Sequence, residues 1–350
     1  MKKSVNILLV FVLAVTCLFA FCACKNQKQD ATETTTGLVC KIKTDDDGEK
    51  YAVATKYTLS KEDADKVSKG DYADIMKDDI VINEYVVDDK TYPIKEIESG
   101  AFSNQLVFKK VTIGENVEKV GSACFAGCTN LEELVLNFVG EKVDAVNEAK
   151  TLGYLFGTTS FNGGVTASVA HVTGGTATSY FVPSALKKVT VTGSVLSDFA
   201  FNGMPIKEVE ITGAVEYIGE GAFGSMTAIN TVKIPATVKE IGKLAFANSS
   251  SIYKIDFSEA TALTTIYQEA FAGCSMLGYG SNEVLLPSSV SKIYNHAFKD
   301  CTSLKTIDLT QTAITEIPTG CFYGCTNLTE VKYATGVTVG NDAIPGSANK

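Results

Sequence analysis

The stretch from Val238 to Phe257 reads VKEIGKLAFANSSSIYKIDF and forms one unit centred on Phe246. Aliphatic residues lie eight and five positions before this phenylalanine and six positions after it, and an alternating apolar pair follows at nine and eleven. The alternating pair predicts a short strand, whereas the three- and four-residue spacing near Phe246 predicts a helical or tight turn that points the ring inward. In chain order these apolar positions are Val238, Ile241, Ile252, Ile255 and Phe257.

The same unit recurs along the chain, and from Phe201 onward its phenylalanines are spaced by 22 to 27 residues. One unit has too few apolar side chains to offset the entropy lost when its backbone is ordered, so we expect the units to stack as a solenoid. Glycine follows the second aliphatic position at Gly121, Gly219 and Gly242, where we expect it to supply a backbone conformation that other residues resist. The repeated rings are Phe102, Phe125, Phe201, Phe223, Phe246, Phe271, Phe298 and Phe322.

These units resemble a known family. VEKVGSACFAGCTNLEELVL from Val117 to Leu136 and VSKIYNHAFKDCTSLKTIDL from Val290 to Leu309 are similar to the BspA-like leucine-rich repeats of bacterial surface proteins. The resemblance covers residues 80–337. It implies a repeat solenoid, a right-handed β/α superhelix in which short parallel strands are joined by turns or short helices.

The regular spacing is interrupted between Phe125 and Phe201, which are 76 residues apart, or about three repeat periods. We therefore expect residues 137–195 to be an elaborated segment with two distorted repeats and a longer exposed insertion from Thr166 to Ser179. The sequence from Leu152 to Gly193 resembles an elaborated unit that recurs in the same family.

The N-terminus has the features of an export signal: two lysines, a nearly unbroken apolar run from Ile7 to Ala20, and then small residues and cysteine. The run is too short to favour a membrane-spanning helix. It resembles a bacterial lipoprotein signal, which implies a signal peptide over residues 1–23 and lipidation of Cys24, with Cys22 as the weaker alternative. The polar residues 24–37 are then predicted to be a flexible tether.

The repeat is absent from residues 38–79. Apolar and polar residues alternate on both sides of an Asp-Gly turn at Asp47, which predicts a hairpin, and the segment from Ser60 to Val67 begins like a capped helix. We expect this region to be an N-terminal cap on the first repeat, and a separate small domain is the alternative. The tail 338–350 is polar and is expected to be frayed.

Composition limits the partner class. The net charge is −9, and all 31 basic residues are lysine. A nucleic-acid-binding protein usually has a positive surface with bidentate arginines, so nucleic acid is disfavoured as a partner.

The body of the chain contains seven cysteines, an odd number that argues against a complete disulfide framework. Four of them occupy the same repeat position as methionine or serine elsewhere, which favours packing over metal binding. Cys124 with Cys128 and Cys321 with Cys325 resemble half of a zinc site, but no histidine is near them in sequence, so we predict no metal. The four equivalent residues are Cys128, Cys274, Cys301 and Cys325.

The sequence gives little support for catalysis. The two histidines, His171 and His296, lie outside any catalytic or metal motif and are expected at the surface, and we predict no catalytic residue and no cofactor. The stretch Asp45 to Glu49 lacks the ligand spacing of a calcium loop, which favours a solvated turn.

Residues between the inward-facing positions of each strand are expected to form an outward ribbon suited to a macromolecular partner. The resemblance implies a lipid-anchored protein on the extracellular face of the membrane that binds proteins or glycans on host, matrix or other cells. A carbohydrate- or cell-wall-binding role is the alternative, with Tyr253, Tyr267, Tyr279 and Tyr294 lining one face, and an enzyme would need a cleft with perturbed acids. The candidate contact residues are Lys110, Thr112, Glu133, Val135, Thr231, Lys233, Lys254, Asp256, Thr306, Asp308, Glu330 and Lys332.

Overall fold

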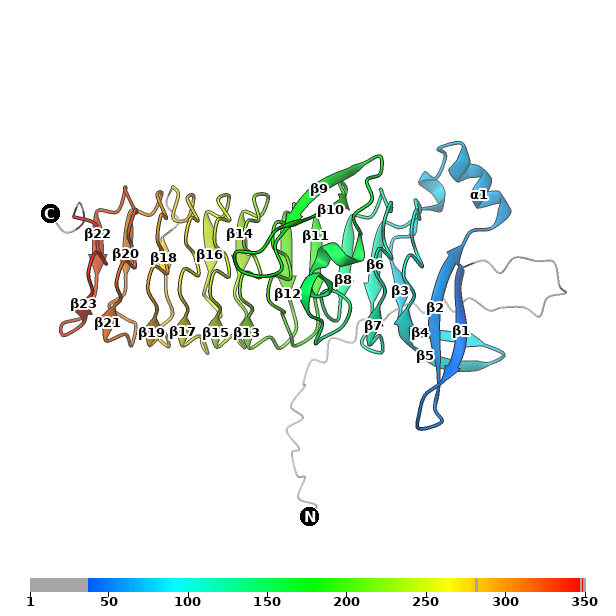
Figure 1. Cartoon of the computed structure of the whole chain (residues 1–350), viewed down its shortest axis with the longest axis horizontal. Coiled ribbons are helices and arrows are strands. Elements are labelled where there is room, and N and C mark those ends of the chain that lie inside the picture. The colour runs from blue at the N-terminus through cyan, green and yellow to red at the C-terminus, as the bar shows by residue number, and fades with distance from the viewer. Residues whose placement is uncertain (1–36, 281–282, 347, 349–350) are drawn as a thin grey trace, which may run out of the picture.

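The computed structural model describes residues 37–280, 283–346 and 348, which form an elongated stack of coils (Figure 1). Short strands of successive coils lie side by side and pair in parallel along the long axis. The solenoid of BspA-type repeats with short parallel strands is therefore confirmed. The predicted signal peptide, Cys24 and the tether up to residue 36 lie outside the described residues.

One side of the solenoid, which we call the first face, carries a strand from almost every coil (Figure 1). Its strands form three hydrogen-bonded sheets, β3 to β12, β14 with β16, and β18 to β22. The strands are β3 (Ile80–Ile82), β6 (Lys110–Ile113), β8 (Glu133–Leu136), β11 (Lys188–Val191), β12 (Glu208–Ile211), β14 (Thr231–Lys233), β16 (Lys254–Asp256), β18 (Val284–Leu285), β20 (Thr306–Asp308) and β22 (Glu330–Lys332).

A second set of strands forms the second face. In the regular coils the second-face strand precedes the turn that carries the repeated phenylalanine, and the first-face strand follows that turn. The second-face strands are also parallel to one another and most are two residues long. They are β5 (Lys90–Ile97), β7 (Lys119–Val120), β13 (Tyr217–Ile218), β15 (Glu240–Ile241), β17 (Thr265–Ile266), β19 (Lys292–Ile293), β21 (Glu316–Ile317) and β23 (Thr338–Val339).

The repeated phenylalanines lie inside the coil and stack on one another. Neighbouring rings from Phe201 to Phe322 have centroids 5.0 to 5.6 Å apart, and Phe102 stacks on Phe125 at 5.8 Å. All of these rings are fully buried. The inward placement predicted from the repeat is therefore confirmed.

The segment around each ring is a tight turn. At Phe246 the amide of Ala247 donates to the carbonyl of Leu244 at 2.9 Å, and Leu244 and Asn248 on either side both have left-handed backbones.

The expectation that Gly219 supplies an unusual backbone conformation is wrong, because its φ is not positive. Glycine is needed there because the adjacent coil approaches closely: a Cβ at Gly219 would lie 2.6 Å from the amide nitrogen of Asp198.

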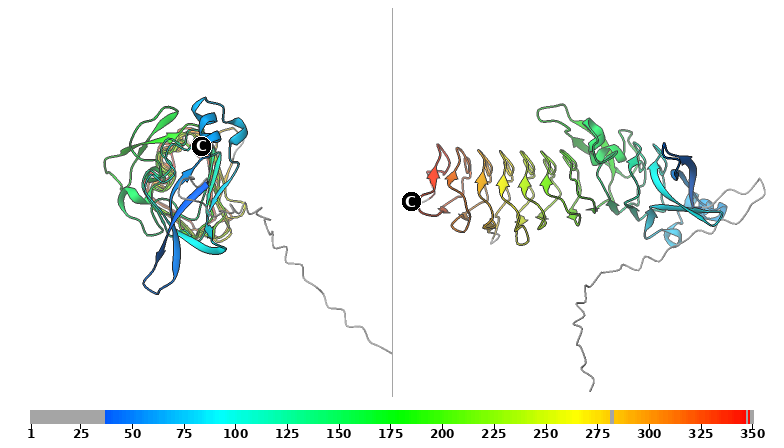
Figure 2. Two further views of the ribbon diagram at one scale, coloured as in Figure 1. Left: turned by 90° about the vertical axis from the view of Figure 1, so that its right-hand side faces the viewer. Right: turned by 90° about the horizontal axis from the view of Figure 1, so that it is seen from below.

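The elaborated segment between Phe125 and Phe201 contains one coil, rather than the two distorted repeats that its length suggested. β11 pairs directly with β8 on one side and with β12 on the other, so only one strand of the first face is added. The extra length forms two 3-10 helices, Asn147–Lys150 and Leu152–Leu155, and an antiparallel hairpin of β9 (Gly164–Val169) and β10 (Thr178–Pro183). Figure 2 shows this hairpin as an arm on the side of the solenoid, at the position of the predicted insertion.

The N-terminal region adds a hairpin to the first coil of the second face. β1 (Gly37–Thr44) pairs with β2 (Lys50–Thr58), which in turn pairs in parallel with β5. The helix α1 (Lys61–Ser68) begins after Ser60, whose hydroxyl accepts from the amide of Asp63. A 3-10 helix (Ala73–Ile75) and β4 (Glu84–Val87), which pairs with β5, complete this end.

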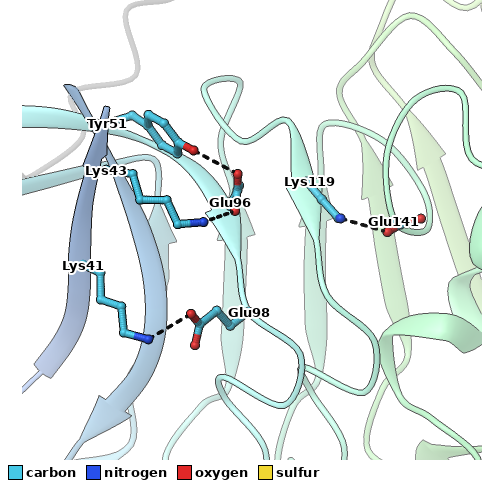
Figure 3. Close-up of polar contacts among 7 residues, drawn as sticks. All are labelled: Lys41, Lys43, Tyr51, Glu96, Glu98, Lys119 and Glu141. Atoms are coloured by element: carbon cyan, nitrogen blue, oxygen red, sulfur yellow. Dashed lines mark hydrogen bonds and ion pairs between the residues drawn. The ribbon is translucent and has the colours of Figure 1, made fainter. Parts of the chain in front are cut away.

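Ion pairs join the hairpin to the solenoid (Figure 3). Glu96 on β5 accepts from Lys43 at 3.0 Å and from the hydroxyl of Tyr51 at 3.1 Å, and Glu98 accepts from Lys41 at 3.2 Å. The hairpin is thus attached by charged side chains as well as by backbone pairing.

Residues 338–346 continue the solenoid, contrary to the expectation of a frayed tail for 338–350. β23 pairs in parallel with β21, and the amide of Phe322 donates to the carbonyl of Ala343 at 2.9 Å. Ala343 is almost fully buried. This partial coil is polar in sequence, but its few small apolar residues are enough to pack on the end of the stack.

Candidate functional site

The outward side chains of the first face form the candidate binding surface. All twelve candidate residues lie on strands of this face, and none is buried. Strand register places Lys110 beside Glu133, Thr231 beside Lys254, and Thr306 beside Glu330, so the residues form rows along the solenoid. They fall in three blocks, on β6 and β8, on β14 and β16, and on β20 and β22.

Other first-face strands fill the gaps between these blocks. β11 and β12 lie between β8 and β14, and they contribute Lys188, Thr190, Glu208 and Glu210. β18 lies next to β20 and exposes Leu285. An alignment on the phenylalanines does not identify these residues, because β11 directly follows none of the repeated rings. The inward Val209 of β12 and Val284 of β18 lie 8 and 13 residues after Phe201 and Phe271, instead of nine. The alternating stretches KVTV and EVEI at these strands were an available signal.

Lysine and glutamate alternate along the row that runs from Lys110 through Glu133 and Lys188 to Glu208. Lys110 lies 2.9 Å from Asp79 and beside Glu133, and Lys188 follows on the next strand. Lys188 contacts Glu208 at 2.7 Å and Glu210 at 2.9 Å, and these two hydrogen-bonded carboxylates raise the pKa of Lys188. This half of the first face is therefore largely self-neutralised.

Two of the candidate carboxylates also take part in local turns. Asp256 accepts from the amide of Ser258 at 3.0 Å, and Asp308 accepts from the amide of Thr310 at 2.8 Å and from its hydroxyl at 2.6 Å. These hydrogen bonds hold the pKa of both carboxyls below the ordinary value. Each carboxylate keeps a fixed position and remains partly exposed, which suits a preorganised contact.

The four tyrosines of the alternative glycan-binding hypothesis do not share one face. Tyr253 precedes β16 on the first face, Tyr279 lies in a turn, and Tyr267 and Tyr294 follow strands of the second face. The rings of Tyr267 and Tyr294 stack with centroids 5.0 Å apart, and the ammonium of Lys292 lies 4.6 Å from the Tyr294 centroid. One face of each ring is thus covered by the other ring, and Lys292 lies over the ring of Tyr294.

The equivalent cysteines have the packing role that their repeat position predicted. Each thiol donates to the carbonyl oxygen of a phenylalanine in the preceding coil, and all four cysteines are buried. Burial raises the pKa of Cys274 to about 12, so its thiol stays protonated near neutral pH. The donor–acceptor pairs are Cys128 with Phe102, Cys274 with Phe246, Cys301 with Phe271, and Cys325 with Phe298.

The histidines are more buried than expected. His171 lies at the tip of the β9–β10 hairpin, half-buried, and its Nδ1 has no hydrogen-bond partner among the described residues. His296 is half-buried, with a left-handed backbone, and its ring lies over Gly320.

Asp45, in the segment weighed against a calcium loop, closes the β1–β2 turn. One of its carboxylate oxygens accepts from the amide of Glu49 at 2.8 Å, and the other contacts Lys95 at 3.3 Å. Across residues 37–280 and 283–346, no group of three or more histidine, cysteine or acidic side chains is placed to hold a metal ion. Within the same ranges, no helix combines the length and apolar character required to cross a bilayer.

Comparisons with known proteins agree with this architecture. The model of the BspA type leucine-rich repeat region matches residues 89–146, 194–280 and 279–348 in six copies, which together span more than half of the chain. A search of curated proteins finds no match.

Several solved structures are similar over most of the chain. A leucine-rich repeat protein from Bacteroides ovatus is 17% identical, with 90% of this chain and 80% of that chain covered and a TM-score of 0.44. A leucine rich cell surface protein from Faecalibacterium prausnitzii is 18% identical, with coverages of 87% and 96% and a TM-score of 0.33. The pneumococcal vaccine antigen PcpA is 13% identical, with coverages of 89% and 85% and a TM-score of 0.31. On the strength of the repeat match, the chain belongs to the BspA-type leucine-rich-repeat family.

Proposed function

We propose that this protein is a surface-anchored binding lipoprotein that attaches to proteins on host cells, matrix or other cells through its first face. The observation that carries the proposal is the set of outward side chains that the three sheets of the first face present from β3 to β22, and its candidate residues are all at least partly exposed. A rigid solenoid presents such a row without a large loss of entropy on binding. We propose a binding role without catalysis.

The anchor is proposed from the sequence. Cleavage before Cys24 and a diacylglyceryl group on its thiol would supply two acyl chains, which suffice for stable membrane attachment. The mass of the mature protein and its partitioning into detergent test this directly. A Cys24→Ser variant is expected to stay uncleaved and unlipidated, whereas a Cys22→Ser variant is expected to be processed normally. Normal lipidation of the Cys24→Ser variant would contradict the assignment.

Binding is tested with the mature ectodomain on immobilised matrix proteins and on a glycan array. Lys254→Glu and Lys332→Glu change exposed first-face lysines, and Lys243→Glu is the matched change on the side chain just after β15 of the second face. We expect the first-face variants to lose protein binding and the Lys243 variant to keep it. Binding only to glycans, lost on Tyr267→Ala, would favour the carbohydrate-binding alternative instead.

A further inference from the structure

The first face is interrupted between β12 and β14. These strands belong to different hydrogen-bonded sheets, although they come from consecutive coils. Ile211 at the end of β12 is partly exposed, whereas the equivalent residues Val191 and Ile234 in the neighbouring coils are buried. The interruption therefore uncovers an apolar side chain that the regular repeat buries.

One hollow lies at this interruption, and a second hollow adjoins it. One has a volume of about 730 Å³ and lies between β12 and β14, with Ile211 and Pro235 among its lining residues. The other has a volume of about 410 Å³ and is lined in part by Val195 and Tyr217, which are 40% and 41% exposed. Ala214 lines both hollows, so we name them together the Ala214 groove.

Carboxylates dominate the charge of the Ala214 groove. Its lining includes four glutamates but a single lysine, Lys233, which pairs with Glu259 at 2.7 Å. From outside the lining, Lys188 is shared between two of the glutamates, and Lys239 pairs with Glu216 at 2.7 Å. Three lysines therefore face four carboxylates, which leaves the groove net negative. The glutamates are Glu208, Glu210, Glu216 and Glu259.

We propose that the Ala214 groove binds an extended, lysine- or arginine-bearing segment of a protein partner. The apolar floor at Ile211 and Ala214 suits the aliphatic stem of a long basic side chain, and the glutamates suit its cationic end. This inference rests on the proposed function, because it adds a contact that runs from β12 of the first face toward Tyr217 of the second face, and it gives the chemistry of the segment that fits there.

The test uses a fluorescent peptide of alternating lysine and valine, with a glutamate-for-lysine peptide as the control ligand. Peptide affinity is measured by anisotropy for the unchanged protein and for Glu210→Lys, Glu259→Lys and Ala214→Tyr. Glu330→Lys on β22 is the matched control, because it makes the same charge change on the same face outside the groove. We expect the three groove variants to weaken binding by about tenfold or more and Glu330→Lys by less than about twofold.

Several results would overturn the inference. These are no binding of the lysine peptide by the unchanged protein, equal binding of the glutamate peptide, or equal weakening by Glu330→Lys and the groove variants. Circular dichroism and thermal unfolding of each variant exclude loss of fold as the cause. The proposed function stands or falls separately, because its test uses whole matrix proteins and the substitutions Lys254→Glu and Lys332→Glu, which lie outside the groove.

Discussion

The rings of Phe223 and Phe246 lie parallel within 4°, with their centroids 5.0 Å apart. They belong to consecutive coils, and each is fully buried. Because the same contact continues from Phe201 to Phe322, ring stacking and strand pairing together hold the coils at a regular spacing. This regular spacing is what aligns the outward residues of the first face.

Removal of one ring from the middle of the stack should be costly. Phe246→Ala leaves a cavity between two stacked neighbours and is expected to lower the free energy of unfolding by about 3 to 5 kcal/mol. Denaturant unfolding measures this change. Tyr323→Ala is the control, since Tyr323 is 54% exposed, and its effect should stay within about 0.5 kcal/mol. A similar cost for the two variants would contradict the structural role of the ring.

The buried thiols predict a different order of stabilities. Cys301 donates to the carbonyl of Phe271 at 3.3 Å, and Ser249 makes the equivalent bond to Phe223 through its hydroxyl. Cys301→Ser should therefore be more stable than Cys301→Ala by about 1 kcal/mol, because only serine keeps a donor for the buried carbonyl. Thermal unfolding of the two variants gives the comparison, and a more stable alanine variant would show that packing alone matters at this position.

Docking of the N-terminal hairpin should weaken in acid. Burial alone would raise the pKa of Glu96, but hydrogen bonds from Lys43 and Tyr51 hold it below its ordinary value of 4.5. A carboxyl with a lowered folded pKa contributes stability above its ordinary pKa, and this is lost as the pH falls through the folded pKa. We therefore propose that residues 38–79 cap the solenoid with pH-dependent strength. The protection factors of the amides in β1 and β2, which correct for the pH dependence of intrinsic exchange, should fall below about pH 4.5.

Substitution of Glu96, which Figure 3 shows in contact with Lys43 and Tyr51, tests the contribution of this carboxylate. Glu96→Gln should speed exchange in β1 and β2 at neutral pH and reduce its acid dependence, with a cost below about 1 kcal/mol because the pair is partly exposed. Glu330→Gln, at the other end of the solenoid, should leave exchange in the hairpin unchanged. If amide exchange in β1 and β2 of Glu96→Gln keeps the acid dependence of the unchanged protein, titration of other groups causes that dependence.

Close approach between coils predicts the effect of adding a methyl group. A Cβ at Gly219 would lie 2.6 Å from the amide nitrogen of Asp198, so Gly219→Ala must displace backbone and should cost about 1 to 3 kcal/mol. Gly346→Ala is a suitable control, because a Cβ at that position would meet no atom within 4 Å. Chemical denaturation of both variants measures the change in the free energy of unfolding. Equal changes for Gly219→Ala and Gly346→Ala would show that close contact between coils does not explain the cost.

The repeat made the solenoid predictable, because inward positions such as Phe246 and Ile255 recur with fixed offsets and each unit needs its neighbours. The coil at residues 137–195 was predicted poorly, since length alone does not distinguish a second repeat from a hairpin on the outside of one coil. The reason for Gly219 was also missed, because contact with Asp198 depends on how adjacent coils stack. The Ala214 groove likewise arises from a break between sheets that has no signature in the spacing.

Lysine footprinting of the bound protein shows whether the partner covers the first face. Acetylation is followed by mass spectrometry for the ectodomain, free and bound to the matrix protein that it recognises. Lys233, Lys254 and Lys332 lie on the first face, whereas Lys243 lies just after β15 and Lys292 on β19 of the second face, and all five are substantially exposed. We expect protection of the first three lysines on binding, with the other two still labelled. Protection of Lys243 and Lys292 with continued labelling of the first-face lysines would contradict binding through the first face.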